Sequence, residues 1–274
     1  MNHYIKYIII SSILIIVILI FLRHKKKYIV SPIKKFPLKN ERKGLTYGDS
    51  VSTIDNGDSI MISEMDGKND VITTFMKSGN GWNKQNEFPE EIINNNLYET
   101  GESVGFYKEG DTLFMGYTGI SAKEPLTIFI RSFNKGAWSN SEARIINTIE
   151  SYSKPSAQTI LKDFVLKDEN KAITQDAYFT VDNKKLTINC NPPKTIDVPE
   201  NGPYKIFTDD NRGLMILSCN KHVYAYTYPD LKMKATMEFP SEVKSLSSSG
   251  NIVVIGGNGH VYVYDLTEYL PILF

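Results

Sequence analysis

Gly48-Asp49-Ser50-Val51 recurs as Gly101-Glu102-Ser103-Val104, 53 residues further along the chain, and this match decides the fold that we expect. Other blocks match in the same order: Gly57–Ile62 with Gly110–Met115, Phe75–Ser78 with Phe129–Ser132, and Asn80–Trp82 with Lys135–Trp138. Self-similarity at a fixed spacing is the signature of an array of small structural units. The sequence therefore predicts at least two such units within residues 45–150.

A shorter repeat lies near the end of the chain. Residues 220–226, Asn-Lys-His-Val-Tyr-Ala-Tyr, match residues 258–264, Asn-Gly-His-Val-Tyr-Val-Tyr, at an offset of 38. Each copy follows an apolar run. Gly-containing turns such as Asn56-Gly57-Asp58, Glu109-Gly110-Asp111 and Asn258-Gly259 separate β-branched and aromatic residues, which is typical of hairpins.

Units of this length with three or four short strands predict an all-β fold, a β-propeller of about five blades over residues 44–274. The expected second strands contain residues 59–62, 112–115, 171–174, 213–217 and 252–255. The last unit lacks one strand, and residues 28–38 are a candidate for a ring-closing outer strand. Residues 87–98 are predicted to form a loop, because Pro89 and three consecutive asparagines interrupt any regular pattern.

The N-terminus predicts a single transmembrane α-helix before the propeller. Residues 4–22 are apolar apart from one lysine and two serines, and 19 helical residues reach about 28 Å, close to the roughly 30 Å hydrocarbon core. We therefore expect residues 1–22 to anchor the chain in a lipid bilayer. A cleavable signal peptide is the alternative, but the run is long for one and lacks a small-residue cleavage site.

Charge divides unevenly along the chain. Residues 23–43, the predicted basic juxtamembrane stalk, contain nine lysines and arginines and one glutamate, whereas residues 44–274 contain 21 basic and 30 acidic side chains. The positive-inside rule predicts a single-pass protein whose C-terminal domain is cytoplasmic. The stalk either fixes this topology or also binds anionic lipid. The acidic balance of the domain argues against nucleic acid as a partner.

The first two units resemble FG-GAP propeller repeats over residues 45–150. The shared pattern is Gly-x-Ser-Val, a Gly-Asp turn, an apolar strand, a Phe-containing strand that ends in a basic residue and Ser, and a Gly-x-Trp block. In the integrin form of this family, loops between blades carry calcium. The nearest equivalent here is Glu64–Asp70, with Asp66 and Asp70 as candidate oxygen ligands, and a polar surface turn is the alternative.

The sequence offers no catalytic constellation, and we predict no enzyme, no cofactor and no metal-site residues. His222 and His260 occupy equivalent repeat positions, which favours a structural role. Asp49, Glu102 and Asp163 are the carboxylates that a propeller glycosidase would use near its central channel. Two of them recur within the repeat, which favours folding over chemistry. We expect Trp82 and Trp138 to pack in the core and not to stack on sugars.

Cys190 and Cys219 are too few for a disulfide framework, although one bridge between them is compatible with the sequence. The predicted function is a membrane-anchored β-propeller that binds or scaffolds another protein through its loops. A surface-exposed adhesin or glycan-binding protein is one alternative, and a propeller glycosidase is a second.

Overall fold

The described residues form five β-sheets in which nearly all neighbouring strands are antiparallel, which confirms the predicted all-β class. The structure is a computed structural model that describes residues 29–37, 44, 46–64, 70–89, 91–93, 96–120, 127–145, 171–173, 178–182, 184–188, 193–200, 204–209, 213–228 and 230–269.

Each sheet is built mainly from strands that follow one another in the sequence. The first sheet contains β3 (Val51–Ile54), β4 (Ser59–Glu64), β5 (Val71–Ser78) and β6 (Gly81–Pro89). The second contains β7 (Glu91–Ile93), β8 (Asn96–Glu109), β9 (Thr112–Ile120), β10 (Thr127–Asn134), β11 (Ala137–Trp138) and β12 (Glu142–Ile145). The third contains β13 (Lys171–Ile173), β14 (Tyr178–Asp182), β15 (Lys185–Ile188) and β16 (Lys194–Asp197). The fourth contains β17 (Tyr204–Asp209), β18 (Leu214–Cys219), β19 (His222–Thr227) and β20 (Met233–Glu238), and the fifth β21 (Ser245–Ser249), β22 (Ile252–Gly257) and β23 (His260–Asp265).

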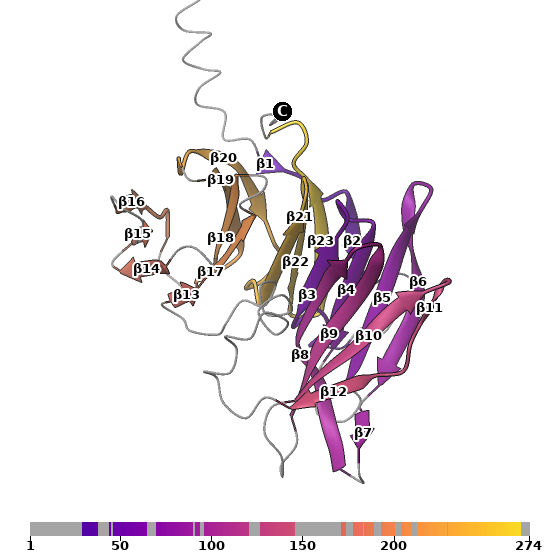
Figure 1. The fold of residues 1–274 in the computed structure, drawn as a ribbon. Coiled ribbons are helices and arrows are strands. Elements are labelled where there is room, and N and C mark those ends of the chain that lie inside the picture. The colour runs from indigo at the N-terminus through magenta and orange to yellow at the C-terminus, as the bar shows by residue number, and fades with distance from the viewer. Residues whose placement is uncertain are drawn as a thin grey trace, which may run out of the picture.

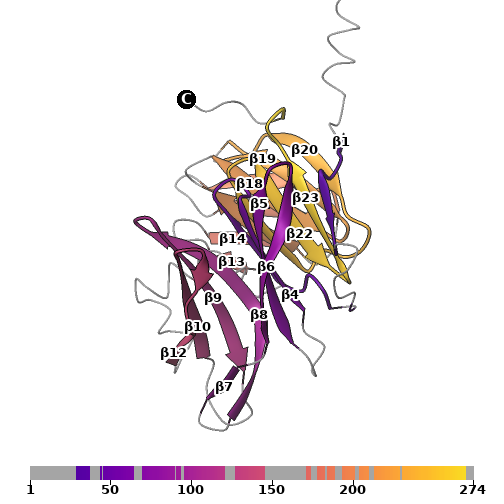
Figure 2. The same cartoon turned by 90° about the vertical axis from the view of Figure 1, so that its right-hand side faces the viewer.

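Two short N-terminal strands complete the fourth and fifth sheets. β1 (Ile29–Val30) pairs in parallel with β20, and β2 (Lys34–Phe36) pairs antiparallel with β23. Both lie on the outer side of their sheet, and Figure 2 shows β1 beside β20. Residues 29–36, part of the predicted ring-closing segment 28–38, therefore supply an outer strand to two sheets and link the start of the described chain to its end.

Hydrophobic clusters between neighbouring sheets fix their order in space. Each of four clusters contains side chains from two sheets. These pairs of sheets are the third with the fourth, the fourth with the fifth, the fifth with the first, and the first with the second. The sheets therefore follow one another in the order third, fourth, fifth, first and second. In Figure 1, β13–β16 lie on the left and β7–β12 at the lower right, where they overlap the first sheet in this view. Burial of these faces is the main stabilising contribution that the sheets make to one another.

Serine hydroxyls connect the innermost strands β21, β3 and β8. The hydroxyl of Ser245 donates to the carbonyl of Gly48 at 2.8 Å, and Ser247 Oγ accepts from the backbone N–H of Thr53 at 3.1 Å. The next junction repeats this arrangement, since Ser50 and Ser52 accept from the N–H groups of two β8 residues, Val104 and Phe106, at 3.1 Å each. Small hydroxyl side chains let the strands approach closely and satisfy backbone groups that would otherwise be buried without a partner.

A β-bulge in β6 lets one strand contribute to two cores. β6 has one extra residue, Gln85, because Thr74 of β5 pairs with Asn86 whereas Phe75 pairs with Lys84. One inserted residue moves the rest of a strand to the opposite face. Trp82 consequently packs toward the fifth sheet and Phe88 toward the second.

The predicted closed propeller is wrong. None of the four clusters joins the second sheet to the third, so among the described residues the row stays open between them. The third sheet shows the physical reason. Its apolar side chains face the fourth sheet, whereas Lys185, Thr187, Thr195 and Asp197 point the other way and are exposed or half-buried. Closing the ring would cost the hydration of this polar face.

Two local predictions also need correction. Lys171–Ile173 is the first strand of its sheet and lies at the edge, not in the second position. The predicted loop over residues 87–98 contains the end of β6, the whole of β7 and the start of β8. β7 pairs with β8 from Glu91 opposite Tyr98 to Ile93 opposite Asn96. β7 ends at Ile93 and β8 begins at Asn96, the last asparagine of the run, so strands flank the run on both sides.

The predicted transmembrane helix is corrected as well. The described residues contain no helix, and hence none long and apolar enough to cross a bilayer. Residues 1–22, on which the anchor was predicted, and residues 23–28 and 38–43 of the predicted stalk lie outside the described residues. The fold is therefore an all-β arrangement of five sheets, and the single-pass membrane assignment with a cytoplasmic C-terminal domain has no support in it.

Candidate functional site

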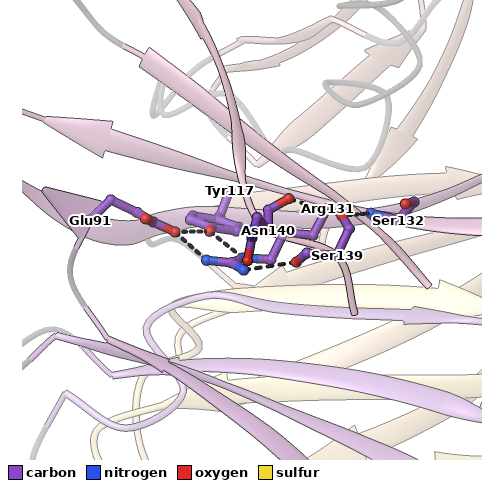
Figure 3. A network of polar contacts seen from close by, with 6 residues as sticks. All are labelled: Glu91, Tyr117, Arg131, Ser132, Ser139 and Asn140. Carbon is purple, nitrogen blue, oxygen red and sulfur yellow. Dashed lines mark hydrogen bonds and ion pairs between the residues drawn. The ribbon is translucent and has the colours of Figure 1, made fainter. Parts of the chain in front are cut away.

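A polar network occupies the interface between the first and second sheets. It brings together Glu91 of β7, Tyr117 of β9 and Arg131 of β10 (Figure 3). The phenol of Tyr117 donates to Glu91 Oε1, and Arg131 Nη2 donates to the same oxygen at 2.6 Å. Both charged side chains are only 14% exposed. A carboxylate and a guanidinium this well buried are expected to need each other, because neither tolerates burial alone.

Arg131 uses each of its three nitrogens. Nε donates to the Tyr117 hydroxyl at 2.8 Å and Nη1 to the carbonyl of Ser139 at 2.9 Å, in addition to the bond to Glu91. The guanidinium also lies over the ring of Phe88, with its central carbon 4.7 Å from the ring centroid. Phe88 belongs to β6, so Arg131 holds together strands of two sheets through a cation–π contact and a fan of hydrogen bonds.

Electrostatics make this network unsuited to acid–base chemistry. Burial, reinforced by the hydrogen bond to Glu91, raises the pKa of the Tyr117 phenol well above its usual range. Burial acts to lower the pKa of Arg131, but the hydrogen bonds to Tyr117 and Glu91 outweigh it and the net shift is upward. A general base or acid needs a pKa near the working pH. The contacts are those of a structural clamp that ties strands of the two sheets together.

The sequence contained part of the signal for this clamp. Arg131-Ser132 matches Lys77-Ser78 in the repeat, and Lys77 likewise lies over an aromatic ring, that of Trp82, at 5.6 Å. The basic residue of the repeat thus stands over an aromatic ring of β6 in both units. Glu91 was missed, because residues 87–98 were predicted to form a loop.

A second polar group lies between the third and fourth sheets. His222 Nδ1 is 2.5 Å from Glu200 Oε1, and the hydroxyl of Tyr224 donates to the same carboxylate oxygen at 3.1 Å. His260, at the equivalent repeat position, is exposed, and its Nδ1 is 3.0 Å from the carbonyl of Asn258. Both histidines start a strand, as the repeat predicts, but they contact different partners.

Cys219 lies beside this group, opposite His222 in the β18–β19 ladder. A cysteine, a histidine and a glutamate in proximity suggest a nucleophile with its base and orienting acid. Cys219 is, however, a fully buried free cysteine. Burial, together with the Glu200 carboxylate, raises the pKa of its thiol to about 11. A buried thiol that keeps its proton is a poor nucleophile, which favours a structural role for this group.

Alkylation should reveal this protection. At pH 8 we expect iodoacetamide to modify Cys219 slowly in the folded protein and readily in denaturant, with the folded rate rising as pH approaches 11. The folded state holds the thiol proton more tightly than the unfolded state, so this group stabilises the fold below about pH 9 and the contribution is lost as pH rises toward 11. Mass spectrometry of the Cys219 peptide measures the rate. Rapid labelling at pH 8 without denaturant would contradict the assignment.

The three carboxylates considered for a glycosidase do not form a site in the described residues. Asp49 Oδ1 accepts a hydrogen bond from Lys244 Nζ at 3.1 Å, in an ion pair that joins the first and fifth sheets. The backbone of Glu102 lies in the irregular part of β8 between Thr100 and Val104, and Asp163 lies outside the described residues. The structure thus shows a structural contact for Asp49 and no pairing of two carboxylates.

The candidate calcium loop is described only at its ends. Glu64 and Asp70 are buried, and Asp66 lies outside the described residues. Across the described part of the chain, no group of three or more His, Cys, Asp or Glu side chains could hold a metal ion.

Both tryptophans pack against hydrophobic cores, as predicted. Trp82 is 6% exposed, and its indole N–H donates to the carbonyl of Gly57 at 2.6 Å. Trp138 is partly buried among Phe88, Phe106 and Phe133, with ring centroids 5.0 to 6.4 Å away. Neither indole ring is displayed for stacking on a sugar.

Replacing the two tryptophans should change the free energy of unfolding by different amounts, because only Trp82 has a hydrogen-bond acceptor for its indole N–H among the described residues. Replacing Trp82 with Phe removes the donor to Gly57, and we expect the free energy of unfolding to fall by about 1 kcal/mol beyond the loss of packing area. Trp138→Phe is the matched control, because among the described residues its buried indole N–H has no acceptor. Urea unfolding of both variants measures the difference. Equal losses would show that the Trp82 hydrogen bond contributes nothing net.

Two exposed apolar side chains, Ile29 and Met233, lie on one face of the fourth sheet. Among the described residues, Ile29 is 67% exposed, Ile33 54% and Met233 44%. Ile29 lies in β1, opposite Thr236 of β20. Thr236 and Met233 pair with Tyr224 and Tyr226, two residues on one face of β19, so Ile29 and Met233 lie on the same face of the fourth sheet. We call this surface the β1–β20 edge and define it by Ile29, Met233 and the flanking Lys232 and Lys234. Ile33 lies against the fifth sheet instead, since its backbone N–H donates to the carbonyl of Val263 in β23 at 2.8 Å.

No known protein family and no curated protein matches this sequence, so the resemblance to FG-GAP repeats stays a prediction. Among solved structures, the computationally designed Ika8 protein is 9% identical, with a TM-score of 0.38 over 83% of this chain and 98% of that one. Sqt1 of Saccharomyces cerevisiae is 10% identical, with a TM-score of 0.34 over 82% and 97%. Glutaminyl cyclase of Myxococcus xanthus is 8% identical, with a TM-score of 0.38 over 86% and 95%. Similarity at this level carries no inference about activity.

Proposed function

We propose that this protein is a protein-binding module that acts without catalysis. The observation that carries the proposal is the β1–β20 edge, where Ile29 and Met233 are exposed to solvent on the same face of the fourth sheet. Single exposed hydrophobic residues are common on protein surfaces, whereas a group of them at one place is typical of an interaction site. Of the four large hydrophobic side chains that are exposed in the described residues, two belong to this edge.

The two polar groups between the sheets support the same proposal, because their contacts favour a structural role. In each of them the charged or titratable side chains bond to one another, and burial raises the pKa values of Tyr117, Tyr224 and Cys219. Groups held in this way fix the sheets rather than react with a substrate. A rigid array with an exposed apolar edge suits binding, because little conformational freedom is lost when a partner docks.

Selection of displayed random peptides against the full-length protein tests the proposal. We expect peptides to be enriched that bind the wild type and fail to bind a variant with Ile29→Ser and Met233→Ser. Both side chains are exposed, so the variant should fold with nearly unchanged stability. No enrichment, or equal binding to the variant, would contradict binding at this edge. Hydrolysis of a glycan or an ester by the purified protein would contradict the absence of catalysis.

A further inference from the structure

We propose that the junction between the fourth and fifth sheets binds a carboxylate group of a ligand, held by Lys35, His260 and Tyr262. This junction lies on the face of the fourth sheet opposite the β1–β20 edge, so the inference goes beyond the proposed function. It starts from the repeat, because the junction of the third and fourth sheets already holds a carboxylate. There the Glu200 side chain meets a histidine and a tyrosine of β19.

Ser241 is the equivalent of Glu200 in the next unit. Residues 195–200, Thr-Ile-Asp-Val-Pro-Glu, align without a gap with residues 236–241, Thr-Met-Glu-Phe-Pro-Ser. In both runs the fourth residue donates its backbone N–H, at 2.7 Å, to the carbonyl of a lysine in the preceding hairpin turn. The two segments therefore leave their sheets in the same way, and the last residue is a glutamate in one and a serine in the other.

The two residues that contact the Glu200 carboxylate recur in β23. His222 and Tyr224 match His260 and Tyr262 in the repeat, and the ring centroids lie 6.3 Å apart in both pairs. In the first pair, the imidazole Nδ1 lies 2.5 Å from the carboxylate oxygen and the phenol donates to that oxygen at 3.1 Å. Among the described residues, no carboxylate contacts the second pair.

Ser241 is too short to take the place of Glu200. Its hydroxyl lies 3.4 Å from the carbonyl of Gly257, and Gly257 lies directly opposite His260 in the β22–β23 ladder. Ser241 thus approaches the histidine from the fourth sheet, as Glu200 approaches its own histidine from the third. A glutamate carboxylate is two bonds further from the backbone than a serine hydroxyl. His260 is exposed, so a carboxylate from outside the chain can reach the position that Ser241 does not.

The charge at the fourth–fifth junction favours an anion. Lys35 pairs with Tyr262 across the β2–β23 ladder, and its Nζ lies 5.0 Å from the centroid of the tyrosine ring. The residue paired with Tyr224 on β20 is Thr236, so this junction has a cation that the third–fourth junction lacks. Lys35 and His260 form no ion pair with a described acidic residue. An entering carboxylate would meet an ammonium, an imidazole and a phenol, all of which can donate hydrogen bonds to it.

Blocked peptides titrated into the full-length protein test the inference. The probe has one glutamate between four glycines and neutral ends, and its control has glutamine instead. The titration is done at about pH 6, because only a protonated imidazole donates from both nitrogens. We expect the glutamate peptide to shift the NMR signals of the His260 and Tyr262 rings until they saturate, and the glutamine peptide to leave them unchanged.

A third peptide separates two sources of a carboxylate. It consists of five glycines with a free C-terminal carboxylate and a blocked N-terminus. Saturable shifts with the glutamate peptide, with this peptide or with both would support the site and identify an acidic side chain or a chain terminus as the group that it binds. The absence of saturable shifts with both peptides would overturn the inference.

Variants of the cations locate the site. Replacing Lys35 or His260 with glutamine should weaken binding of the glutamate peptide by about threefold or more, read from the Tyr262 signals. Lys77→Gln is the matched control, because Lys77 also lies over an aromatic ring, that of Trp82, but in the first sheet. It should leave affinity unchanged. Unchanged affinity in both the Lys35 and the His260 variants would contradict the site.

Ser241→Glu places a carboxylate in the junction from within the chain. Without any peptide, this variant should show the His260 and Tyr262 shifts of the peptide-bound wild type. It should also bind the glutamate peptide about tenfold more weakly or less, because an attached group has a high effective concentration. Ser241→Gln has the same length without the charge and should not reproduce the shifts. Equal effects of the two variants would refute recognition of a carboxylate, and neither result bears on binding at Ile29 and Met233.

Discussion

Replacing Arg131 with leucine should lower the free energy of unfolding by about 3 kcal/mol, because it leaves the Glu91 carboxylate in a buried position without its counter-ion. The Tyr117 hydroxyl and the Ser139 carbonyl lose their donors in the same variant. The cation–π contact with Phe88 is also lost. Denaturant unfolding of the full-length protein measures the change, and the loss should be larger than for any exposed ion pair such as Lys221 with Glu238.

A double variant provides the control for Arg131. Replacing both Glu91 and Arg131 with leucine removes the unpaired charge together with its partner, so stability should recover by about 1 kcal/mol or more relative to Arg131→Leu alone. Lys221→Leu, which breaks a pair whose side chains are more than half exposed, should cost less than about 1 kcal/mol. A loss of that small size for Arg131→Leu would show that Glu91 is hydrated in the folded protein and that the clamp contributes little.

The sequence predicted the strands better than it predicted how the sheets assemble. Hairpin turns such as Asn56-Gly57 and Asn258-Gly259 correctly separate paired strands, since Asn56, Gly57, Asn258 and Gly259 all have positive φ. Local signals of this kind depend only on neighbouring residues. Whether a row of sheets closes into a ring depends on the faces of its terminal sheets. The polar outer face of β15 and β16 follows from the register of these strands, which periodicity alone does not give.

In the candidate sites, too, the sequence predicted local features and missed those that depend on residues far apart in the chain. The repeat placed both tryptophans in the core and indicated a basic residue before each of them, which the structure places over aromatic rings of β6. It gave no sign of Glu91, because its partners Tyr117 and Arg131 lie 26 and 40 residues away. The β1–β20 edge was also missed. Ile29 was part of a segment predicted to close a ring, and its exposure depends on a pairing with β20 some 200 residues later.

Replacing Gly48 with alanine should lower the free energy of unfolding by roughly 3 kcal/mol, the sum of backbone strain and steric overlap. Gly48 has a φ of +86°, and a Cβ added there would lie 2.7 Å from the backbone carbonyl oxygen of His260. That oxygen belongs to β23, which cannot move away without disturbing its ladder with β22 and β2. The first and fifth sheets meet at this point, so the variant should loosen the junction that the Ser245 hydroxyl also bridges.

Gly79→Ala separates the two causes of this loss. Gly79 also has a positive φ, +59°, but an added Cβ would meet no atom within 4 Å. Its cost should therefore be about 1 kcal/mol, the backbone contribution alone. The difference between the two variants in thermal or denaturant unfolding measures the overlap at Gly48. The repeat extends the argument, because Gly101 is the matching residue and a Cβ there would lie 3.0 Å from Cβ of Ser63 in the first sheet. The first glycine of the repeat is thus the residue that lets one sheet approach the next, and equal losses at Gly48 and Gly79 would refute that role.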